Sequence, residues 1–175
     1  DEIMDKYRIE KIKTIGDAYM AAGGIPARNQ TNPMAVVAAG LEMINQLKQL
    51  NLEKHSKGET AWLLRLGIHT GSVISGVVGK NKFAFDIWGD AVNTAARMES
   101  SGEVMQVNVS GSTYRIVEPY FEFTPRGKIK AKNKGEIEMY FVNRLKPEFS
   151  STQDGMVPNQ AFLQEIGLVK KEFQA

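Results

Sequence analysis

The chain has 175 residues, no cysteine and two histidines, and its 22 Lys+Arg against 20 Asp+Glu give a net charge of +2. This length fits one domain, and a hydrophobic fraction of 42% with a charged fraction of 24% is typical of a globular protein. The lack of cysteine excludes disulfides, Cys-ligated zinc and thiol catalysis, and two histidines leave little for a histidine metal cage. No apolar run reaches the roughly 18 residues of a membrane span.

The basic charge is concentrated in one segment. Residues 126–134, RGKIKAKNK, hold five basic and no acidic residues, so the rest of the chain sums to 2 − 5 = −3. Its lysines recur at every second position and would share one face if the segment is extended. These are Lys128, Lys130, Lys132 and Lys134. The pattern fits either an edge strand protected by lysines or a contact to a triphosphate or a nucleic acid, although it lacks interleaved aromatic residues.

The first half of the chain predicts alternating helices and strands. Residues 1–7 look like the last turns of a helix, and two strand-like runs around Gly16-Asp17 predict a β-hairpin. Asn32-Pro33 starts an amphipathic helix that runs to about Leu50, followed by a polar loop over 51–60. The apolar runs 61–70 and 72–79 predict buried strands.

The second half continues the alternation. Residues 83–88 alternate as a strand, 90–100 have helical spacing, and 107–110 and 111–117 predict a short strand and a short helix. A strand, the basic connection and a final strand follow. We therefore expect an α+β domain with a mixed or antiparallel sheet over 1–146, and a linker with an amphipathic helix over 147–175. The apolar residues of that helix are Phe162, Ile166, Val169 and Phe173.

Three side chains on the predicted strands and turns could carry chemistry. Asp17, in a tight turn after glycine, is either a good turn former or a carboxylate that binds a hard cation with a neighbour. Lys13 either extends its ammonium to the surface or donates into a pocket. Asp86 lies in an apolar strand, where a carboxylate is costly unless it is paired, exposed or hydrogen-bonded to a ligand.

A polar stripe marks the predicted helix over 90–100. Asp90, Asn93 and Arg97 are spaced i, i+3 and i+7, so they share one face. The amide and the guanidinium, one turn apart, could converge on one anionic group. The alternative is a solvated face with Asp90 placed favourably for the helix dipole.

Four blocks, in this order, together resemble the class III nucleotidyl cyclase catalytic domain: KIKTIGDAYMAAGGIP, LGIHTGSVISGVVG, FAFDIWGDAVNTAARMESSG and RGKIKAKNKGEIEMYFV. The resemblance covers about residues 1–144. It implies a ferredoxin-like α+β fold with active sites between two domains of a head-to-tail homodimer. The implied activity is that of a cytoplasmic adenylyl cyclase, which converts ATP into 3′,5′-cyclic AMP and pyrophosphate with two Mg²⁺ or Mn²⁺ ions.

The resemblance also implies roles for individual residues. Asp17 resembles the second metal-binding aspartate, Asn93 the residue that orients the ribose, and Arg97 the residue that stabilises the reacting phosphate. Lys132 aligns with the triphosphate-binding lysine, and Lys134 is its less closely matched neighbour.

The adenine-reading pair of the family resembles Lys13 and Asp86. Adenine presents an acceptor at N1 and a donor at N6, which a lysine and an aspartate match, whereas guanine reverses this edge. Guanylyl members of the family have Glu and Cys at these positions, where this chain has Lys13 and Asp86. ATP is therefore the expected substrate, with no nucleic acid partner.

One part of the family pattern has no counterpart in the sequence. The first metal-binding aspartate of the family precedes the segment that matches residue 1, so we expect an N-terminally truncated fold without its first strand, inactive as given. Two other functions remain open: a non-catalytic nucleotide-binding or dimerisation module derived from a cyclase, and a guanylyl cyclase.

Overall fold

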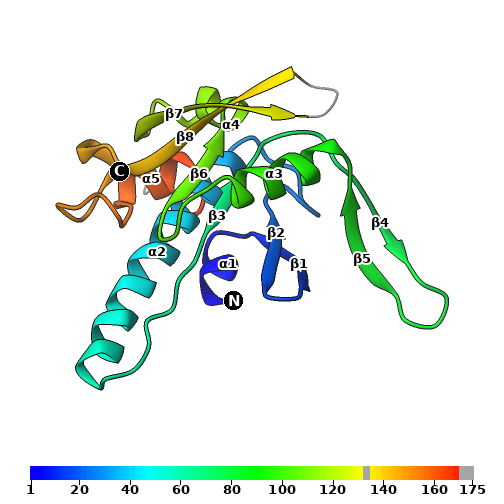
Figure 1. The fold of residues 1–175 in the computed structure, drawn as a ribbon. Coiled ribbons are helices and arrows are strands. Elements are labelled where there is room, and N and C mark those ends of the chain that lie inside the picture. The colour runs from blue at the N-terminus through cyan, green and yellow to red at the C-terminus, as the bar shows by residue number, and fades with distance from the viewer. Residues whose placement is uncertain (132–134, 170–175) are drawn as a thin grey trace.

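The structure is a computed structural model that describes residues 1–131 and 135–169. A four-stranded mixed sheet forms its centre, in the order β3-β6-β8-β7, with β3 and β6 parallel and the other neighbours antiparallel (Figure 1). These strands are β3 (Leu66–Ile68), β6 (Val107–Ser110), β7 (Phe121–Ala131) and β8 (Gly135–Leu145). The expected α+β fold with a mixed sheet is confirmed.

Helices cover both faces of this sheet. Helix α2 (Asn32–Ser56) buries Val37, Leu41 and Ile44, and its Gly40 lies against Val107 of β6. The next residue of β6, Asn108, points to the opposite face and donates to the backbone of α3 (Asp90–Ser100). The sheet is therefore a central layer between α2 and α3.

Helix α2 is longer than the sequence predicts. The first part of the predicted loop is helical to Ser56, since residues 51–56 contain no glycine or proline. Lys57 is the C-cap, and Gly58, whose φ is +71°, lets the chain turn back; the amides of both residues donate to last-turn carbonyls. Beyond this turn, Nδ2 of Asn51 donates to the backbone carbonyl of Trp62, and the backbone amide of Trp62 donates to Oδ1 of Asn51.

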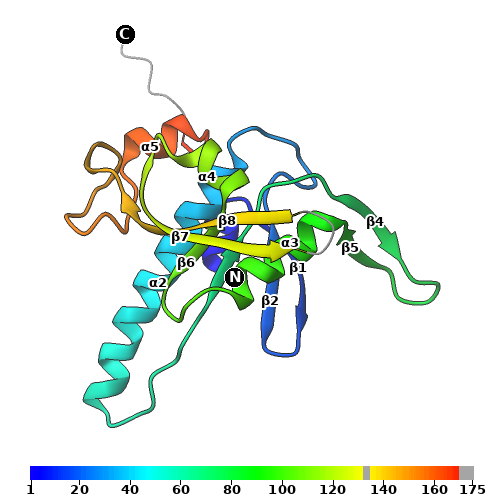
Figure 2. The same cartoon turned by 45° about the horizontal axis from the view of Figure 1, so that its top comes forward.

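Two hairpins extend from the central body (Figures 1 and 2). The first confirms the predicted hairpin: β1 (Glu10–Ile15) and β2 (Ala18–Ala22) are joined at Gly16, and they follow helix α1 (Glu2–Lys6). The second joins β4 (Ile74–Val78) to β5 (Ala84–Trp88).

The prediction of two buried strands over 61–79 is wrong in part. Only Leu66–Ile68 joins the central sheet, whereas β4 belongs to the second hairpin and leaves Ile74 71% and Val77 63% exposed. An apolar, β-branched run predicts a strand, but burial needs a second layer to pack against. The described part of this chain supplies no such layer over β4.

The C-terminal segment packs onto the same core. After α4 (Gly111–Val117) and β8, a short 3₁₀ helix (Pro147–Phe149) leads to α5 (Gln160–Glu165). Phe162 is fully buried, with its ring against those of Tyr120, Phe121 and Phe149. Ile166 is also buried, Val169 is 39% exposed, and Phe173 lies outside the described residues. No helix in the described ranges is both long and apolar enough to cross a membrane.

Candidate active site

An ion pair between the two hairpins forms the centre of the site. The ammonium Nζ of Lys13 on β1 lies 2.6 Å from Oδ2 of Asp86 on β5, and the amide of Ile87 donates to Oδ1 at 2.8 Å. The Asp86 side chain is only 13% exposed. The hydrogen bond from Lys13, and then the amide of Ile87, hold the pKa of Asp86 below its ordinary value. Of the arrangements that the sequence left open for Asp86, the structure shows pairing.

A β-bulge in β1 lies directly before Lys13. The pairing with β2 shifts register between Lys11 and Lys13. Such a bulge adds twist and redirects the following side chain. In this strand the bulge lies just before Lys13, whose side chain reaches Asp86 of β5.

Lys13 of this ion pair lines a cavity of about 310 Å³. Its wall combines one lysine and one amide with apolar side chains from β1, β2, β5 and α3. The lining residues are Lys13, Ile15, Met20, Ile87, Trp88, Gly89, Val92 and Asn93. A partly apolar cleft with a few polar groups is the usual form of a site for a planar organic ligand. The sequence does not predict this apolar wall, because its residues are of types common in any protein core. Only the folded arrangement brings them to one cavity.

Gly89 turns the chain from β5 into α3. Its φ is +134°, a conformation that side-chain-bearing residues rarely adopt, and it forms the N-cap of the helix. Helix α3 begins directly after Gly89, and Asn93 in its first turn lies in the cavity wall. The buried face of the helix consists of Ala91, Thr94 and Met98, so the predicted polar stripe lies beside this face and outside it.

Arg97 lies one turn beyond Asn93. Its Nη1 donates to the backbone carbonyl of Lys130 on β7, at 3.4 Å. The guanidinium therefore bridges α3 and the strand that leads into the basic segment. Lys128 of that strand pairs with Glu136 at 3.7 Å, while Lys132 and Lys134 lie outside the described residues.

Asp17 is separate from these residues. It is exposed in the turn between β1 and β2, and Figure 1 shows this turn directed away from α3. Among the described residues there is no group of three or more His, Asp or Glu side chains that could hold a metal ion. One chain thus brings together Lys13, Asp86 and Asn93, but not the predicted metal carboxylate.

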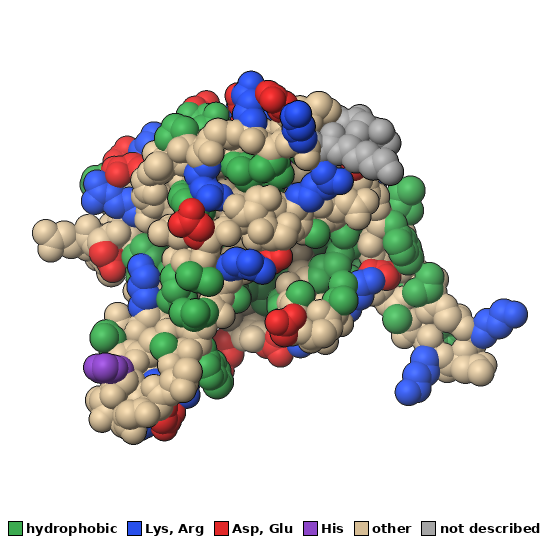
Figure 3. All heavy atoms as spheres, in the orientation of Figure 1, with side chains coloured by type: hydrophobic (Ala, Val, Ile, Leu, Met, Phe, Trp, Pro, Cys, Tyr) green, Lys and Arg blue, Asp and Glu red, His purple; other side chains and the backbone are tan. Residues whose placement is uncertain are grey.

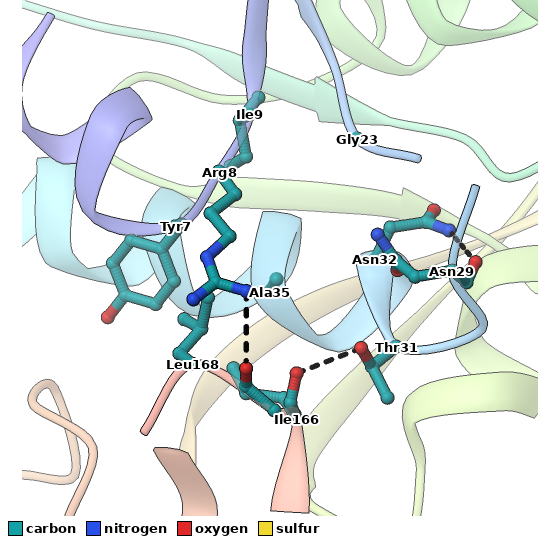
Figure 4. Close-up of a pocket in the computed structure, with 11 residues that line it drawn as sticks. Tyr7, Arg8, Ile9, Gly23, Asn29, Thr31, Asn32, Ala35, Ile166 and Leu168 are labelled. Atoms are coloured by element: carbon teal, nitrogen blue, oxygen red, sulfur yellow. Dashed lines mark hydrogen bonds between the residues drawn. The ribbon is translucent and has the colours of Figure 1, made fainter. Parts of the chain in front are cut away.

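A second cavity, of about 170 Å³, lies where the C-terminal segment meets the start of the chain (Figure 4). The Thr31 hydroxyl donates to the carbonyl of Ile166 at 2.9 Å, and Arg8 donates to that of Gly167 at 3.4 Å. None of the predicted site residues lines it. Its contacts hold α5 against α1 and α2.

Apolar side chains continue from the first cavity onto the surface. Figure 3 shows hydrophobic side chains gathered along the β4–β5 hairpin, with basic side chains at its far end. Ile15 and Trp88 belong to the cavity wall and are 59% and 40% exposed, while Val77 and Phe83 are 63% and 77% exposed. An exposed apolar surface of this kind usually marks an interaction site.

Known proteins resemble this chain in sequence and fold. The family described as the Adenylate and Guanylate cyclase catalytic domain matches residues 1–144. An adenylate cyclase of Mycobacterium tuberculosis is 39% identical over 142 residues, which are 81% of this chain and 31% of that protein. Guanylyl cyclase C of Homo sapiens is 37% identical over 169 residues, 94% of this chain and 16% of that protein. The chain therefore spans less than a third of either relative.

Solved structures agree. The adenylyl cyclase CyaB from P. aeruginosa has a TM-score of 0.78 at 27% identity, covering 85% of this chain and 79% of that one. The guanylate cyclase domain of RhGC from Catenaria anguillulae, solved in complex with GTP, has a TM-score of 0.76 at 30% identity and covers 83% and 78%. The sequence match over 1–144 and the shared fold lead to one conclusion: this chain belongs to the adenylate and guanylate cyclase catalytic domain family, the class III nucleotidyl cyclases.

Proposed function

We propose that this domain acts on ATP and forms 3′,5′-cyclic AMP and pyrophosphate. The observation that carries the choice of ATP is the Lys13–Asp86 pair, whose lysine lines the cavity. A lysine ammonium only donates hydrogen bonds, and an ionised aspartate only accepts them. Lys13 would donate to N1 of adenine, and Asp86 would accept from the N6 amino group.

Guanine in the same pose would meet the wrong partners. Its N1–H would face the ammonium of Lys13, and its O6 would face the carboxylate of Asp86. Unpaired polar groups of this kind allow strong discrimination. GTP is the second candidate, because guanylyl cyclases are among the relatives of this chain.

The remaining residues fit a phosphoryl transfer. The ribose 3′ oxygen attacks the α-phosphorus, and the bond to the leaving pyrophosphate breaks. Asn93 lines the cavity and would hold the ribose, while Arg97, one turn further, would meet the charge that develops on the α-phosphate. To do so, its guanidinium would exchange the carbonyl of Lys130 for a phosphate oxygen. Lys132 and Lys134 are proposed to bind the triphosphate.

Mg²⁺ or Mn²⁺ is the proposed cofactor, with Asp17 as one ligand. When bound, such an ion activates the nucleophile and stabilises the triphosphate. Asp17 alone does not fit a complete two-ion site, since the described residues contain no group of three or more Asp, Glu or His side chains that could hold a metal ion. We assign no step of the reaction to the metal on this structure.

We also propose that the active form is a head-to-tail homodimer. The exposed apolar side chains of the two hairpins provide a surface, and the turn of the β1–β2 hairpin points away from α3 of the same chain (Figure 1). A second copy in the opposite orientation would bring the turn of one β1–β2 hairpin toward α3 of its partner.

The test is an assay of the full-length protein with ATP or GTP and Mn²⁺ or Mg²⁺, with detection of both cyclic nucleotides. We expect cyclic AMP as the main product and its loss in Arg97→Ala. Preference for GTP would favour the guanylyl alternative. Binding of ATP without turnover would show a non-catalytic module and contradict the proposal.

A further inference from the structure

The C-terminal end of α3 is held by an arginine from the basic segment over 126–134. Arg126 is the first residue of the basic segment, yet its side chain is only 18% exposed. Its Nη1 donates to the carbonyl of Ser101, the C-cap of α3, at 2.6 Å, and its Nη2 donates to Glu103 at 3.0 Å. The guanidinium also lies over the ring of Phe141, 4.0 Å from its centroid. The guanidinium of Arg126 is thus engaged within the domain by Ser101, Glu103 and Phe141.

These contacts suit the end of a helix. The last carbonyls of a helix lack intrahelical partners and carry partial negative charge, so a cation that donates to them is favourable. A guanidinium can satisfy a carbonyl and a carboxylate at once and still stack on an aromatic ring, which an ammonium cannot do.

A short path of hydrogen bonds joins Arg126 to Arg97. The amide of Ser101 donates to the carbonyl of Arg97 at 2.9 Å, while the carbonyl of Ser101 receives Arg126. The guanidinium of Arg97 in turn donates to Lys130, four residues beyond Arg126 on the same strand. Strand β7 therefore contacts the Arg97 turn twice, once through the helix end and once directly.

We propose that Arg126 is a positioning residue that fixes the last turn of α3 against β7 and thereby sets the place of Arg97. The catalytic part of this inference rests on the proposed function, in which Arg97 acts on the reacting phosphate. Arg126 itself touches none of the cavity residues named above. Asn108 holds the same helix from the sheet, with its Nδ2 donating to the carbonyl of Met98 at 2.7 Å, so α3 keeps one anchor when Arg126 is replaced.

Hydrogen–deuterium exchange tests the positioning without any catalysis. In Arg126→Met, the amides of Ser101 and Gly102 should exchange about tenfold faster, because local opening of the helix end becomes easier. Exchange in α2 should not change. Arg144→Met is the matched control, since Arg144 of β8 makes a comparable two-bond contact with Glu122 of β7 rather than with the end of α3. Unchanged exchange at the end of α3 in Arg126→Met would overturn the proposal.

Kinetics test the consequence for Arg97. In the full-length protein, Arg126→Met should lower kcat for cyclic AMP formation about 10- to 100-fold, since small misplacement of a catalytic group has effects of this size. KM for ATP should change by less than about threefold, because base recognition is untouched. Arg126→Lys should recover part of the loss, since lysine can still donate to Ser101, and it provides a second variant if Arg126→Met folds poorly.

A double variant separates positioning from a direct role. If Arg126 acts through Arg97, adding Arg126→Met to Arg97→Ala should lower kcat no further than Arg97→Ala alone. If the two substitutions instead lower kcat independently, so that their fold-changes multiply in the double variant, the inference is contradicted. A wild-type protein that forms no cyclic nucleotide would refute the proposed function, and the exchange experiment would still decide whether Arg126 holds α3.

Discussion

At the scale of single residues, the site depends on one ion pair with two functions. Lys13 and Asp86 connect the hairpins to each other at 2.6 Å, and Lys13 also lines the cavity. In the absence of a ligand each satisfies the other, so neither group is left buried and unpaired. A base that binds there would have to match the same donor and acceptor.

Exchanging this pair should change the choice of base. Lys13→Glu with Asp86→Cys replaces a donor by an acceptor and removes the carboxylate, so we expect preference to move from ATP toward GTP by about tenfold or more. The measurement is the ratio of kcat/KM for the two nucleotides. Unchanged preference for ATP would contradict the role of the pair in base recognition, and Lys11→Glu, on the same strand, is a control that should leave the ratio unaltered.

The Lys13–Asp86 pair should make the free energy of unfolding depend on pH. The pKa of Asp86 is lower in the folded than in the unfolded chain, so its contribution is present above the ordinary carboxyl value and is lost as the pH falls through the folded value. Below about pH 4 we therefore expect wild type to lose its advantage over Asp86→Asn. Unfolding in urea at pH 7 and at pH 3 measures this. An equal difference between the two proteins at both pH values would be the contrary result.

At the scale of elements, the position of α3 decides whether Asn93 and Arg97 reach the site. The helix lies so close to β3 that a Cβ added to Gly67 would overlap the backbone nitrogen of Glu99. Backbone cannot move aside as a flexible side chain can. Gly67, Asn108 and Arg126 therefore fix one helix from β3, β6 and β7.

Gly67→Ala should separate α3 from the sheet. We expect a loss of about 1–3 kcal/mol in the free energy of unfolding, the usual cost of overpacking. Gly40→Ala is the control, because its Cβ would meet Ile68 and Val107 at 3.5 Å, an ordinary contact, and alanine favours the helix. Chemical denaturation compares the two. Equal stability of both variants would show that α3 can shift without cost.

At the scale of the whole molecule, the C-terminal segment completes the core. Phe162 is fully buried among rings of β7 and the 3₁₀ helix, although it lies beyond the family match at residue 144. Phe162→Ala should cost about 3–5 kcal/mol of stability through the cavity it leaves. Val169→Ala, at a half-exposed position, should cost less than about 0.5 kcal/mol. A small effect of Phe162→Ala on the unfolding midpoint would show that the segment does not stabilise the domain.

The hairpin surface gives a prediction about assembly. Phe83→Asp and Val77→Glu place charges on exposed apolar positions of the β4–β5 hairpin, so they should shift a dimer toward monomer by at least about tenfold in dissociation constant. Sedimentation at several concentrations measures this. Thermal stability of the monomer should stay constant. Leu52→Glu is the control, since Leu52 is equally exposed but lies at the far end of α2. Loss of dimer in the control, or its persistence in the hairpin variants, would contradict the proposed interface.

The sequence by itself determined most of the local structure. Hydrophobic period, Asn-Pro at a helix start and Gly-Asp in a turn are local signals, and α2, α3, α4 and the β1–β2 hairpin follow them. The four blocks also predicted the family. Boundaries were missed where no helix-breaking residue marks them, as in the six residues by which α2 extends beyond Leu50.

Only the tertiary structure decided which residues meet. Lys13 and Asp86 are 73 positions apart, and their contact depends on how two hairpins leave the body. The exposure of β4 and the inward turn of Arg126 depend on which neighbouring surface is available, and a residue pattern carries no record of that. The sequence by itself determined which functional groups are present, because the chemistry of a side chain is local. Only the tertiary structure decided which of these groups meet, because contacts between distant segments depend on the folded chain as a whole.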